Sequence, residues 1–242
     1  MGPRDKPEDD DLGTDAYAVR RPPALDTAAG KRTIAAMTQA ASDTASAERR
    51  YAAVAIGLHW LIAALIATNI WLAWGFEDLK GLAKFNQMQL HKSVGITVLI
   101  LSLGRLGWRL THRPPPLPAH MPRWEKFAAH AVHWGFYVIM VGLPITGWIM
   151  VSASPSNIPT LLYQTIPWPH LEFVHALPMG DRKGIDEAME ETHELLGKLT
   201  YVLIVLHVAA ALKHQFWNKD GLIWRMAPFA ALKAKAKLSG ES

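Results

Sequence analysis

Two histidines, His193 and His207, lie fourteen residues apart on one long apolar stretch. At about 100° per residue, this spacing is close to four helical turns, so both rings point the same way and lie about 21 Å apart along the helix axis. On a membrane-spanning helix, each ring would lie near a different face of the bilayer, where ionisable groups are costly and usually functional. One helix that carries a ligand at each of two depths predicts two stacked cofactors.

The composition limits which cofactors the chain can hold. The 242 residues include eleven histidines and ten tryptophans but no cysteine. Disulfides, cysteine-ligated iron–sulfur clusters and thioether-attached haem are therefore excluded, and a metal or haem must rely on His, Met or carboxylate ligands. The net charge is +4, but the basic residues flank apolar stretches instead of forming one patch, so we expect no nucleic-acid partner.

Four apolar stretches are each long enough to cross a bilayer, which takes about 20 residues. They cover residues 52–76, 91–110, 127–151 and 193–217. Tryptophans lie near their ends, as is typical of membrane spans (Trp74, Trp108, Trp124, Trp217). The pattern predicts an all-α integral membrane protein with a four-helix bundle over residues 51–226, in preference to a soluble bundle.

The remaining residues form two tails and one long connection. Residues 1–50 lack a sustained apolar period, which predicts a disordered cytoplasmic tail, and their acidic start does not resemble a signal peptide. Residues 227–242 predict a basic cytoplasmic tail. The connection over residues 152–192 is expected outside the cell membrane, where it holds a short helix or a pair of strands.

Lysine and arginine in the flanks predict the orientation, because cytoplasmic flanks are enriched in these residues. Three flanks are rich in them: the segment before the first span, the connection between spans two and three, and the segment after span four. The other two connections are poorer, with Lys80 and Lys84 in one and Arg182 and Lys183 in the other. Both termini are therefore predicted to be cytoplasmic.

This topology sorts the histidines by depth. His91 and His193 open their spans near the outer face, whereas His59 and His207 lie near the inner face. His130 and His133 also lie at the inner level, and we expect them to hydrogen-bond within the bundle or near the inner cofactor. His112, His170 and His175 fall in connections and are expected at the surface.

The residue one turn after each histidine distinguishes candidate cofactor ligands from histidines that are not ligands. A flat cofactor beside a ligand needs a small residue at position i+4, since residues i and i+4 share one helix face. Gly95, Gly197, Ala63 and Ala211 follow His91, His193, His59 and His207 in this way, but Trp134 and Tyr137 follow His130 and His133. The test favours an outer pair, His91 with His193, and an inner pair, His59 with His207.

Two histidines on one iron suit electron transfer better than oxygen binding, because no axial position stays open. Zinc is a poorer candidate, since its sites usually have four ligands, or three and a water. A transporter or carrier of metal ions that uses the same histidines as ion ligands is an alternative from another class.

Five motifs carry a family resemblance: GLHW at 57–60, LHKSVG at 90–95, AHAVHWGFY at 129–137, THELLGKL at 192–199 and LHVAAALKHQFW at 206–217. In this order they resemble the bacterial cytochrome b561 family, related to the cytochrome b subunits of nickel–iron hydrogenases, over about residues 50–226. The resemblance implies a four-helix membrane bundle with two b-type haems, whose axial ligands are His59, His91, His193 and His207. It also implies electron exchange with ubiquinone.

Three further residues are assigned with the resemblance in view. Arg105 lies fourteen residues after His91, hence on the same face at the inner depth, and we expect it to pair with an inner-haem propionate or to reach the lipid headgroups. The resemblance implies that His214 lies near the quinone headgroup. His120, in the proline-rich connection, is a second candidate for a quinone contact.

One type of family member oxidises superoxide at the outer face and passes the electron inward to quinone. A superoxide oxidase is therefore the alternative within the redox class. Capture of an anion favours a positive approach, yet four acids precede His193: Asp186, Glu187, Glu190 and Glu191. These acids form either a solvated helix face or a docking site for a basic periplasmic electron donor on the 152–192 segment.

Overall fold

The computed structural model describes residues 31–38, 41 and 50–228. The chain divides into two units, Met1–Ser42 and Asp43–Ser242. In the first unit residues 31–38 are helical. The tail predicted for residues 1–50 lies largely outside the described residues, as does most of the tail predicted for 227–242.

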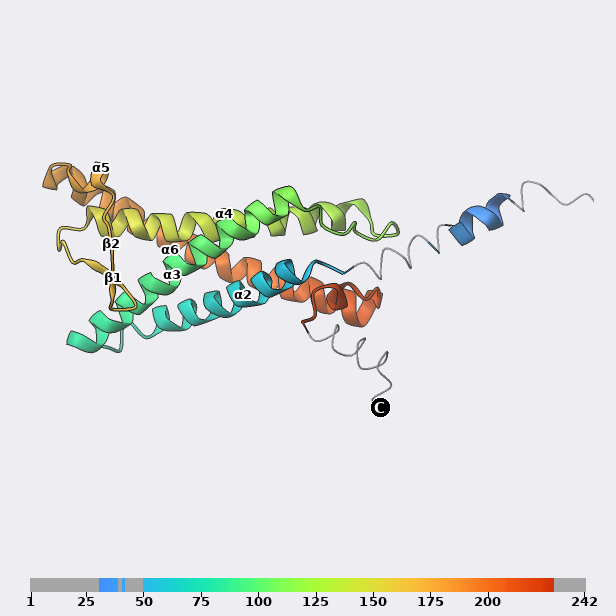
Figure 1. Cartoon of the computed structure of the whole chain (residues 1–242), viewed down its shortest axis with the longest axis horizontal. Coiled ribbons are helices and arrows are strands. Elements are labelled where there is room, and N and C mark those ends of the chain that lie inside the picture. The colour runs from blue at the N-terminus through green and yellow to red at the C-terminus, as the bar shows by residue number, and fades with distance from the viewer. Residues whose placement is uncertain (1–30, 39–40, 42–49, 229–242) are drawn as a thin grey trace, which may run out of the picture. The chain divides into compact units, whose positions relative to one another are not determined.

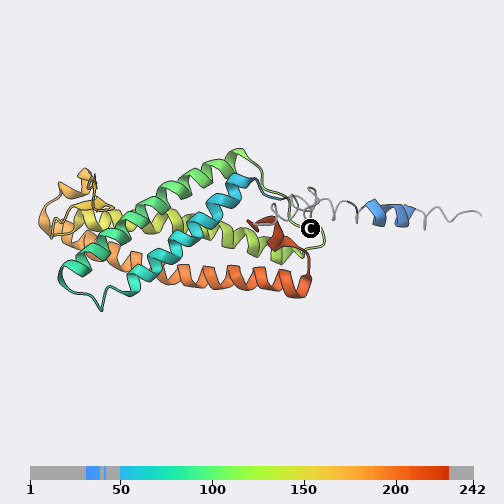
Figure 2. The same cartoon turned by 60° about the horizontal axis from the view of Figure 1, so that its bottom comes forward.

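Four long helices form the second unit: α2 (Ala53–Trp74), α3 (Gly81–Thr111), α4 (Arg123–Ala153) and α6 (Met179–Lys213). They run side by side, and successive helices point in opposite directions (Figure 1, Figure 2). All four are long and apolar enough to cross a membrane. The predicted all-helical bundle with four membrane-spanning helices is confirmed.

Two of the helices extend well beyond the apolar stretches seen in the sequence. α3 begins ten residues before His91, and α6 begins fourteen residues before His193. The polar start of α6 carries an i,i+4 ion pair between Lys183 and Glu187 at 3.7 Å, which supports a helix in water. Hydropathy detects only the part of a helix that lies in hydrocarbon, so the spans expected at residues 91–110 and 193–217 cover only part of these two helices.

The helices pack in the order α2, α3, α4, α6. The closely packed pairs among the described helices are α4 with α6, α2 with α3, and α3 with α4. A glycine lets α6 approach α4 closely: a Cβ at Gly135 would come within 3.1 Å of Leu203, whereas one at Gly142 would make an ordinary contact with Leu196 at 3.7 Å. The buried apolar core lies between α2, α3 and α4 (Ile62, Leu72, Val94, Val98, Tyr137, Met140).

A small hairpin covers one end of the bundle, here called the hairpin end. Strands β1 (Thr160–Leu162) and β2 (Ile166–Trp168) pair antiparallel, and the four-residue helix α5 (Glu172–His175) follows. The strand pair and the short helix expected within residues 152–192 are therefore both present. Tyr163 and Gln164 turn the chain with φ of 51° and 61°.

Polar side chains of α3 fasten the hairpin. The Gln89 amide donates to the Pro159 carbonyl at 2.7 Å and accepts from the Leu161 N–H at 3.2 Å. Ser93 Oγ accepts from the Tyr163 N–H at 2.8 Å. Gln89 and Ser93 are fully buried, so these bonds are made away from water and fix the position of the hairpin on α3.

The opposite end, here called the far end, holds residues 50–52, the 112–122 connection and residues 214–228. A π-helical turn η1 (His214–Asn218) ends α6, and a 3₁₀ turn η2 (Leu222–Arg225) follows. The returning chain contacts the start of α2, since Trp60 Nε1 donates to the Met226 carbonyl at 2.7 Å and the Tyr51 N–H to the Arg225 carbonyl at 3.3 Å.

Buried Arg182 joins the start of α6 to the end of α4. Its guanidinium donates to the carbonyls of Ala153 at 3.1 Å and Ser154 at 2.7 Å and to Asn157 Oδ1 at 2.6 Å. Only 5% of the residue is exposed. The arginine therefore satisfies carbonyls that the end of α4 leaves without helical partners.

We expect Arg182→Met to destabilise the protein by about 2 kcal/mol, because it removes charge-assisted hydrogen bonds and leaves buried acceptors without donors. Thermal unfolding of the detergent-solubilised protein, followed by tryptophan fluorescence, measures the effect. The neighbouring Lys183→Met is the control, because the Lys183 side chain is 71% exposed. Equal melting temperatures for the two variants would show that Arg182 does not stabilise the end of α4.

Candidate functional site

The two α6 histidines meet rings from two different helices. His193 faces His91 of α3, with ring centres 6.3 Å apart, and His207 faces His59 of α2, with ring centres 6.1 Å apart. The two rings of each pair are inclined at 66°. The structure thus brings together both pairs selected in the sequence, one toward the hairpin end and one toward the far end.

Each pair bridges two helices that do not pack closely against each other. α6 packs closely against α4, but neither α2 nor α3 is among the close neighbours of α6 in the described part of the chain. The facing rings therefore meet across a wider separation than packed helices leave. A flat group held between two facing rings would need helices that are separated in this way.

The hydrogen bonds of the hairpin-end pair leave one nitrogen of each ring available. The Nδ1–H of His91 donates to the Asn69 carbonyl at 3.2 Å. His193 Nδ1 lies 3.1 Å from Thr146 Oγ1, whose own proton goes to the Leu143 carbonyl, so the imidazole is the donor. Both rings then carry the proton on Nδ1 and offer the Nε2 lone pair. This is the tautomer that a metal-ligating histidine needs.

A cavity of about 360 Å³ adjoins the hairpin-end pair. His91, His193 and Gly95 line it together with aromatic side chains, among them Phe76 and Trp148. A Cβ at Gly147 would come within 3.2 Å of the His193 ring. A glycine at this position therefore leaves room for the imidazole.

The glycine one turn after His193 also leaves open space. A Cβ added at Gly197 would meet nothing within 4 Å, and one at Gly95 would meet only the Asn69 amide, at 3.7 Å. The small residues predicted to make room for a cofactor therefore border open space at this pair.

The far-end pair has a third histidine close by. The His133 ring centre lies 5.6 Å from that of His207, closer than that of His59 at 6.1 Å. His130, in contrast, is exposed, and its Nδ1 bonds the Lys126 carbonyl of its own helix at 2.6 Å. By ring distance alone, either His59 or His133 could be the partner of His207. The residue at i+4 favours His59, because it is the small Ala63 after His59 and the bulky Tyr137 after His133.

Arginines concentrate positive charge at the far-end pair. Arg105 of α3 interacts electrostatically with His59, His133 and His207. Arg109, one turn further, lies 5.8 Å from the ring centres of both Trp134 and Tyr137. An anionic group held beside these histidines would meet two guanidinium groups.

The donor set excludes a conventional structural metal site within the described residues. Across residues 31–38, 41 and 50–228, no group of three or more His, Cys, Asp or Glu side chains is arranged to hold a metal ion. Two imidazoles facing each other instead suit a metal whose other ligands come from a planar cofactor.

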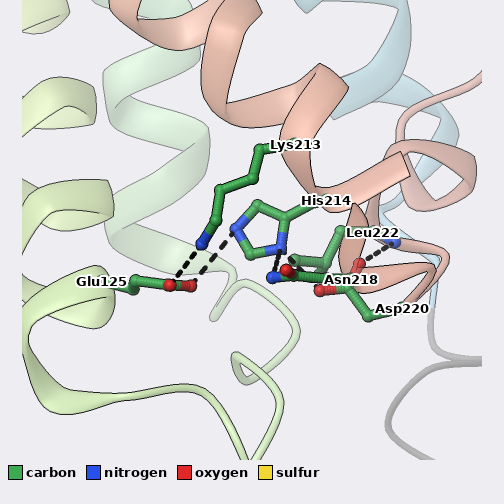
Figure 3. A network of polar contacts seen from close by, with 6 residues as sticks. All are labelled: Glu125, Lys213, His214, Asn218, Asp220 and Leu222. Carbon is green, nitrogen blue, oxygen red and sulfur yellow. Dashed lines mark hydrogen bonds and ion pairs between the residues drawn. The ribbon is translucent and has the colours of Figure 1, made fainter. Parts of the chain in front are cut away.

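His214 belongs to a polar network at the far end, which Figure 3 shows. His214 Nδ1 lies 2.6 Å from Asp220 Oδ2, and Lys213 Nζ lies 2.5 Å from Glu125 Oε1. His120, the second residue predicted to contact a quinone, is exposed in the 112–122 connection and is not part of this network. Of the two residues predicted to contact a quinone, His214 is therefore half-buried and hydrogen-bonded, whereas His120 is exposed.

Two connection histidines are less exposed than expected. His170 and His175 are half-buried, and their rings stack with centres 4.8 Å apart. Burial, followed by the neighbouring His175, lowers the pKa of His170. The hairpin and α5 fold back over the end of α4, which covers residues that a simple loop would expose. His112 is exposed as expected and stacks on Trp108.

Several residues of these sites were missed in the sequence. Asn69 acts through its backbone carbonyl, which has no sequence signal. Thr146 lies thirteen residues from the nearest histidine, His133, and is surrounded in sequence by the uncharged residues that are usual in a membrane span. Glu125 resembles a routine acid in the first turn of a helix.

Comparison with known proteins shows what the chain is similar to. The sequence model of prokaryotic cytochrome b561 matches residues 50–229. A protein of Yersinia pestis named "Probable superoxide oxidase CybB" is 28% identical over 186 residues, which cover 74% of this chain and 97% of that protein. Two Escherichia coli proteins are similar: cytochrome b561 homolog 2 (27% identical, covering 73% of this chain and 90% of that protein) and homolog 1 (26%, covering 74% and 97%).

Proposed function

The chain belongs to the prokaryotic cytochrome b561 family, and from this premise we propose that it is a di-haem electron carrier of the bacterial inner membrane. It transfers electrons between a donor on the periplasmic side and the ubiquinone pool. The family implies haem b as the cofactor and a multi-pass membrane location. The number of haems, their ligands, the orientation and the quinone partner are the parts that we propose here.

The observation that carries the proposal is the repeated geometry of the two histidine pairs. Histidine nitrogens bind first-row metals at about 2 Å, and a ring centre lies roughly 1 Å behind its nitrogen, so two rings on one iron have centres about 6 Å apart. The measured separations are 6.3 Å for His91 and His193 and 6.1 Å for His59 and His207. Both pairs fit one haem iron between their rings.

The protein holds each haem in a defined way. His91 and His193 would ligate the iron through Nε2, while Asn69 and Thr146 fix their rings through Nδ1. His59 and His207 would ligate the second iron, with Arg105 placed to neutralise a propionate. Bound haem supplies a one-electron couple, and a histidine on each side leaves no open coordination position.

α6 provides the path across the membrane, since it carries one ligand of each haem fourteen residues apart, about 21 Å along the axis. The hairpin end faces the periplasm, and the far end faces the cytoplasm. Support comes from the basic residues of the far end, which lie around the 112–122 connection (Arg109, Arg113, Arg123, Lys126) and after α6 (Lys219, Arg225). Electrons therefore pass between a periplasmic donor at the hairpin end and quinone at the far end, with His214 as the quinone contact.

Superoxide oxidation is the second candidate, favoured by the name of the Yersinia pestis relative, "Probable superoxide oxidase CybB". The charge at the hairpin-end cavity opposes superoxide binding. Two acids, Asp186 and Glu190, line this cavity, and only one lysine, Lys92, lines it with them. A net negative mouth repels an anion and attracts a basic donor protein. A metal-ion carrier, the candidate from another class, lacks a site with three or more ligands among the described residues.

Replacing single histidines tests the ligand assignment. His91→Ala or His193→Ala should lower the haem content from about two to about one per chain, because the hairpin-end iron would lose one of its two protein ligands. His59→Ala and His207→Ala should each lose the other haem. Quantification of extracted haem per protein, with the reduced-minus-oxidised spectrum, gives the count. His133→Ala is the control and should retain both haems; loss of haem there, with retention in His59→Ala, would reassign the far-end ligand.

The space beside His193 yields a second test. Gly197→Leu should lose the hairpin-end haem, because its side chain would enter the open space one turn after the ligand. The control is Ala209→Leu, which should keep two haems. Ala209 is exposed and lies on the opposite side of α6 from His207. Unchanged haem content in Gly197→Leu would mean that no cofactor lies over this turn.

An assay with generated superoxide and a short-chain ubiquinone separates the two redox candidates. We expect the purified haem-loaded protein to show no quinone-dependent consumption of superoxide, because the acidic mouth repels the anion. Rapid, quinone-dependent consumption would replace the periplasmic-donor proposal with the superoxide oxidase.

A further inference from the structure

The hairpin-end cavity holds two buried polar atoms that the protein leaves without partners. Trp168 Nε1 of β2 and Asn69 Oδ1 of α2 are both buried, and neither has a hydrogen-bond partner among the described residues. Both residues line the cavity together with His91 and His193. A polar atom that stays buried without a partner costs free energy, so two of them in one cavity point to a ligand with polar groups.

A neighbouring tryptophan shows what is unusual about Trp168. The rings of Trp148 and Trp168 lie together at the cavity, with their centres 5.2 Å apart. Trp148 Nε1 donates to the Pro169 carbonyl at 2.8 Å and so fastens the hairpin to α4. Trp168 is half-buried beside it, yet its N–H has no acceptor in the part of the chain that the structure describes. The packing of the hairpin therefore uses one indole donor and leaves the other available to a ligand.

Lys92 is the one lysine or arginine among the residues that line this cavity. It is half-buried and interacts electrostatically with His91 and His170. Asp186 and Glu190 line the same cavity, but Lys92 forms no ion pair with a carboxylate of the described residues. A half-buried ammonium without a counter-ion is poorly stabilised, so the cavity offers a cation as well as an N–H donor.

A carboxylate fits these two donors. An ammonium and an indole N–H can only donate, so their common partner is an acceptor, and charge-assisted bonds to a carboxylate are among the strongest hydrogen bonds in proteins. Haem b, the cofactor that the family implies, carries two propionates. Lys92 directly follows the proposed ligand His91, and Trp168 belongs to the strand β2 of the covering hairpin. The cavity beside the ligand thus has two donors for a carboxylate of the cofactor.

We propose that Lys92 and Trp168 bind a propionate of the hairpin-end haem, and that Trp168 thereby ties the hairpin to the cofactor. This rests on the proposed function, which places a haem at the hairpin end. Lys92 keeps the propionate ionised, and Trp168 donates to it from β2. Gln89 and Ser93 of α3 fasten β1 and the turn after it. The two strands of the hairpin are therefore held by different partners, β1 by α3 and β2 by the haem.

Redox titration of the haem-loaded protein, followed by visible spectroscopy at several pH values, tests the propionate site. Lys92→Met removes a positive charge that favours the reduced haem, so the midpoint potential of the hairpin-end haem should fall. We expect the reduction equilibrium to shift about tenfold, or about 59 mV for one electron. The potential should also depend more steeply on pH than in the wild type, because the propionate loses the charge that keeps it ionised. The signal that is absent from His193→Ala identifies the hairpin-end haem.

Two measurements test the role of Trp168. Trp168→Phe keeps the aromatic ring and removes the N–H, so it should lower the same potential by a smaller amount. Hydrogen exchange of the wild type tests the tie to the hairpin, because amides of residues 160–168 should exchange faster when the hairpin-end haem is lost in His193→Ala. His207→Ala, which loses the other haem, is the control and should exchange there as the wild type does. Equal exchange in His193→Ala and the wild type would show that the haem does not hold the hairpin.

Matched variants separate the outcomes of the titration. Lys84→Met removes an exposed lysine of α3 outside the cavity and should leave both potentials unchanged, and Lys92→Arg keeps the charge and should retain the wild-type potential. If Lys92→Met does not retain the hairpin-end haem, the potential of Trp168→Phe decides. A wild-type protein that binds no haem at the hairpin end would overturn the proposed function itself. Wild-type potentials in Lys92→Met or Trp168→Phe, with both haems present, would overturn only the propionate site.

Discussion

The pairing of the two α6 histidines with rings from α2 and α3 is the constraint on which the arrangement of the bundle depends. Each pair keeps two helices at a fixed separation without close packing between them. A polar ring in hydrocarbon is stable only when its nitrogens are satisfied, which favours a common partner for the two rings of a pair. Under the proposed function that partner would be haem iron, and the cofactor would then serve as part of the core.

α4 carries no proposed ligand but determines where α6 can lie. Gly135 allows close approach of α6, Gly147 leaves room for the His193 ring, and Thr146 Oγ1 accepts a hydrogen bond from that ring. Arg182, near the start of α6, donates hydrogen bonds to carbonyls at the end of α4 and so joins the two helices. Positions that look like ordinary helix packing therefore set the depth and rotation of both α6 histidines.

The sequence predicted the four helices and both histidine pairs because hydropathy, depth and the i+4 neighbours are local properties. It did not predict the long polar starts of α3 and α6, since these continue a helix outside the apolar stretch. The partial burial of His170 and His175 depends on the fold of the hairpin, which local patterns do not encode. Glu125 and Asp220 meet at His214 only after α4, η1 and the following turn come together, so their partnership is a tertiary property. The proximity of His133 to His207 shows that depth alone cannot assign a ligand.

The most direct test of this account is the number and spin state of the haems in the purified, haem-loaded protein. Haem quantification together with electron paramagnetic resonance of the oxidised protein measures both. The account predicts two haems b per chain, both low-spin, because each iron has a histidine on both sides. A single haem per chain, or a high-spin ferric signal from an iron with an open axial position, would contradict it.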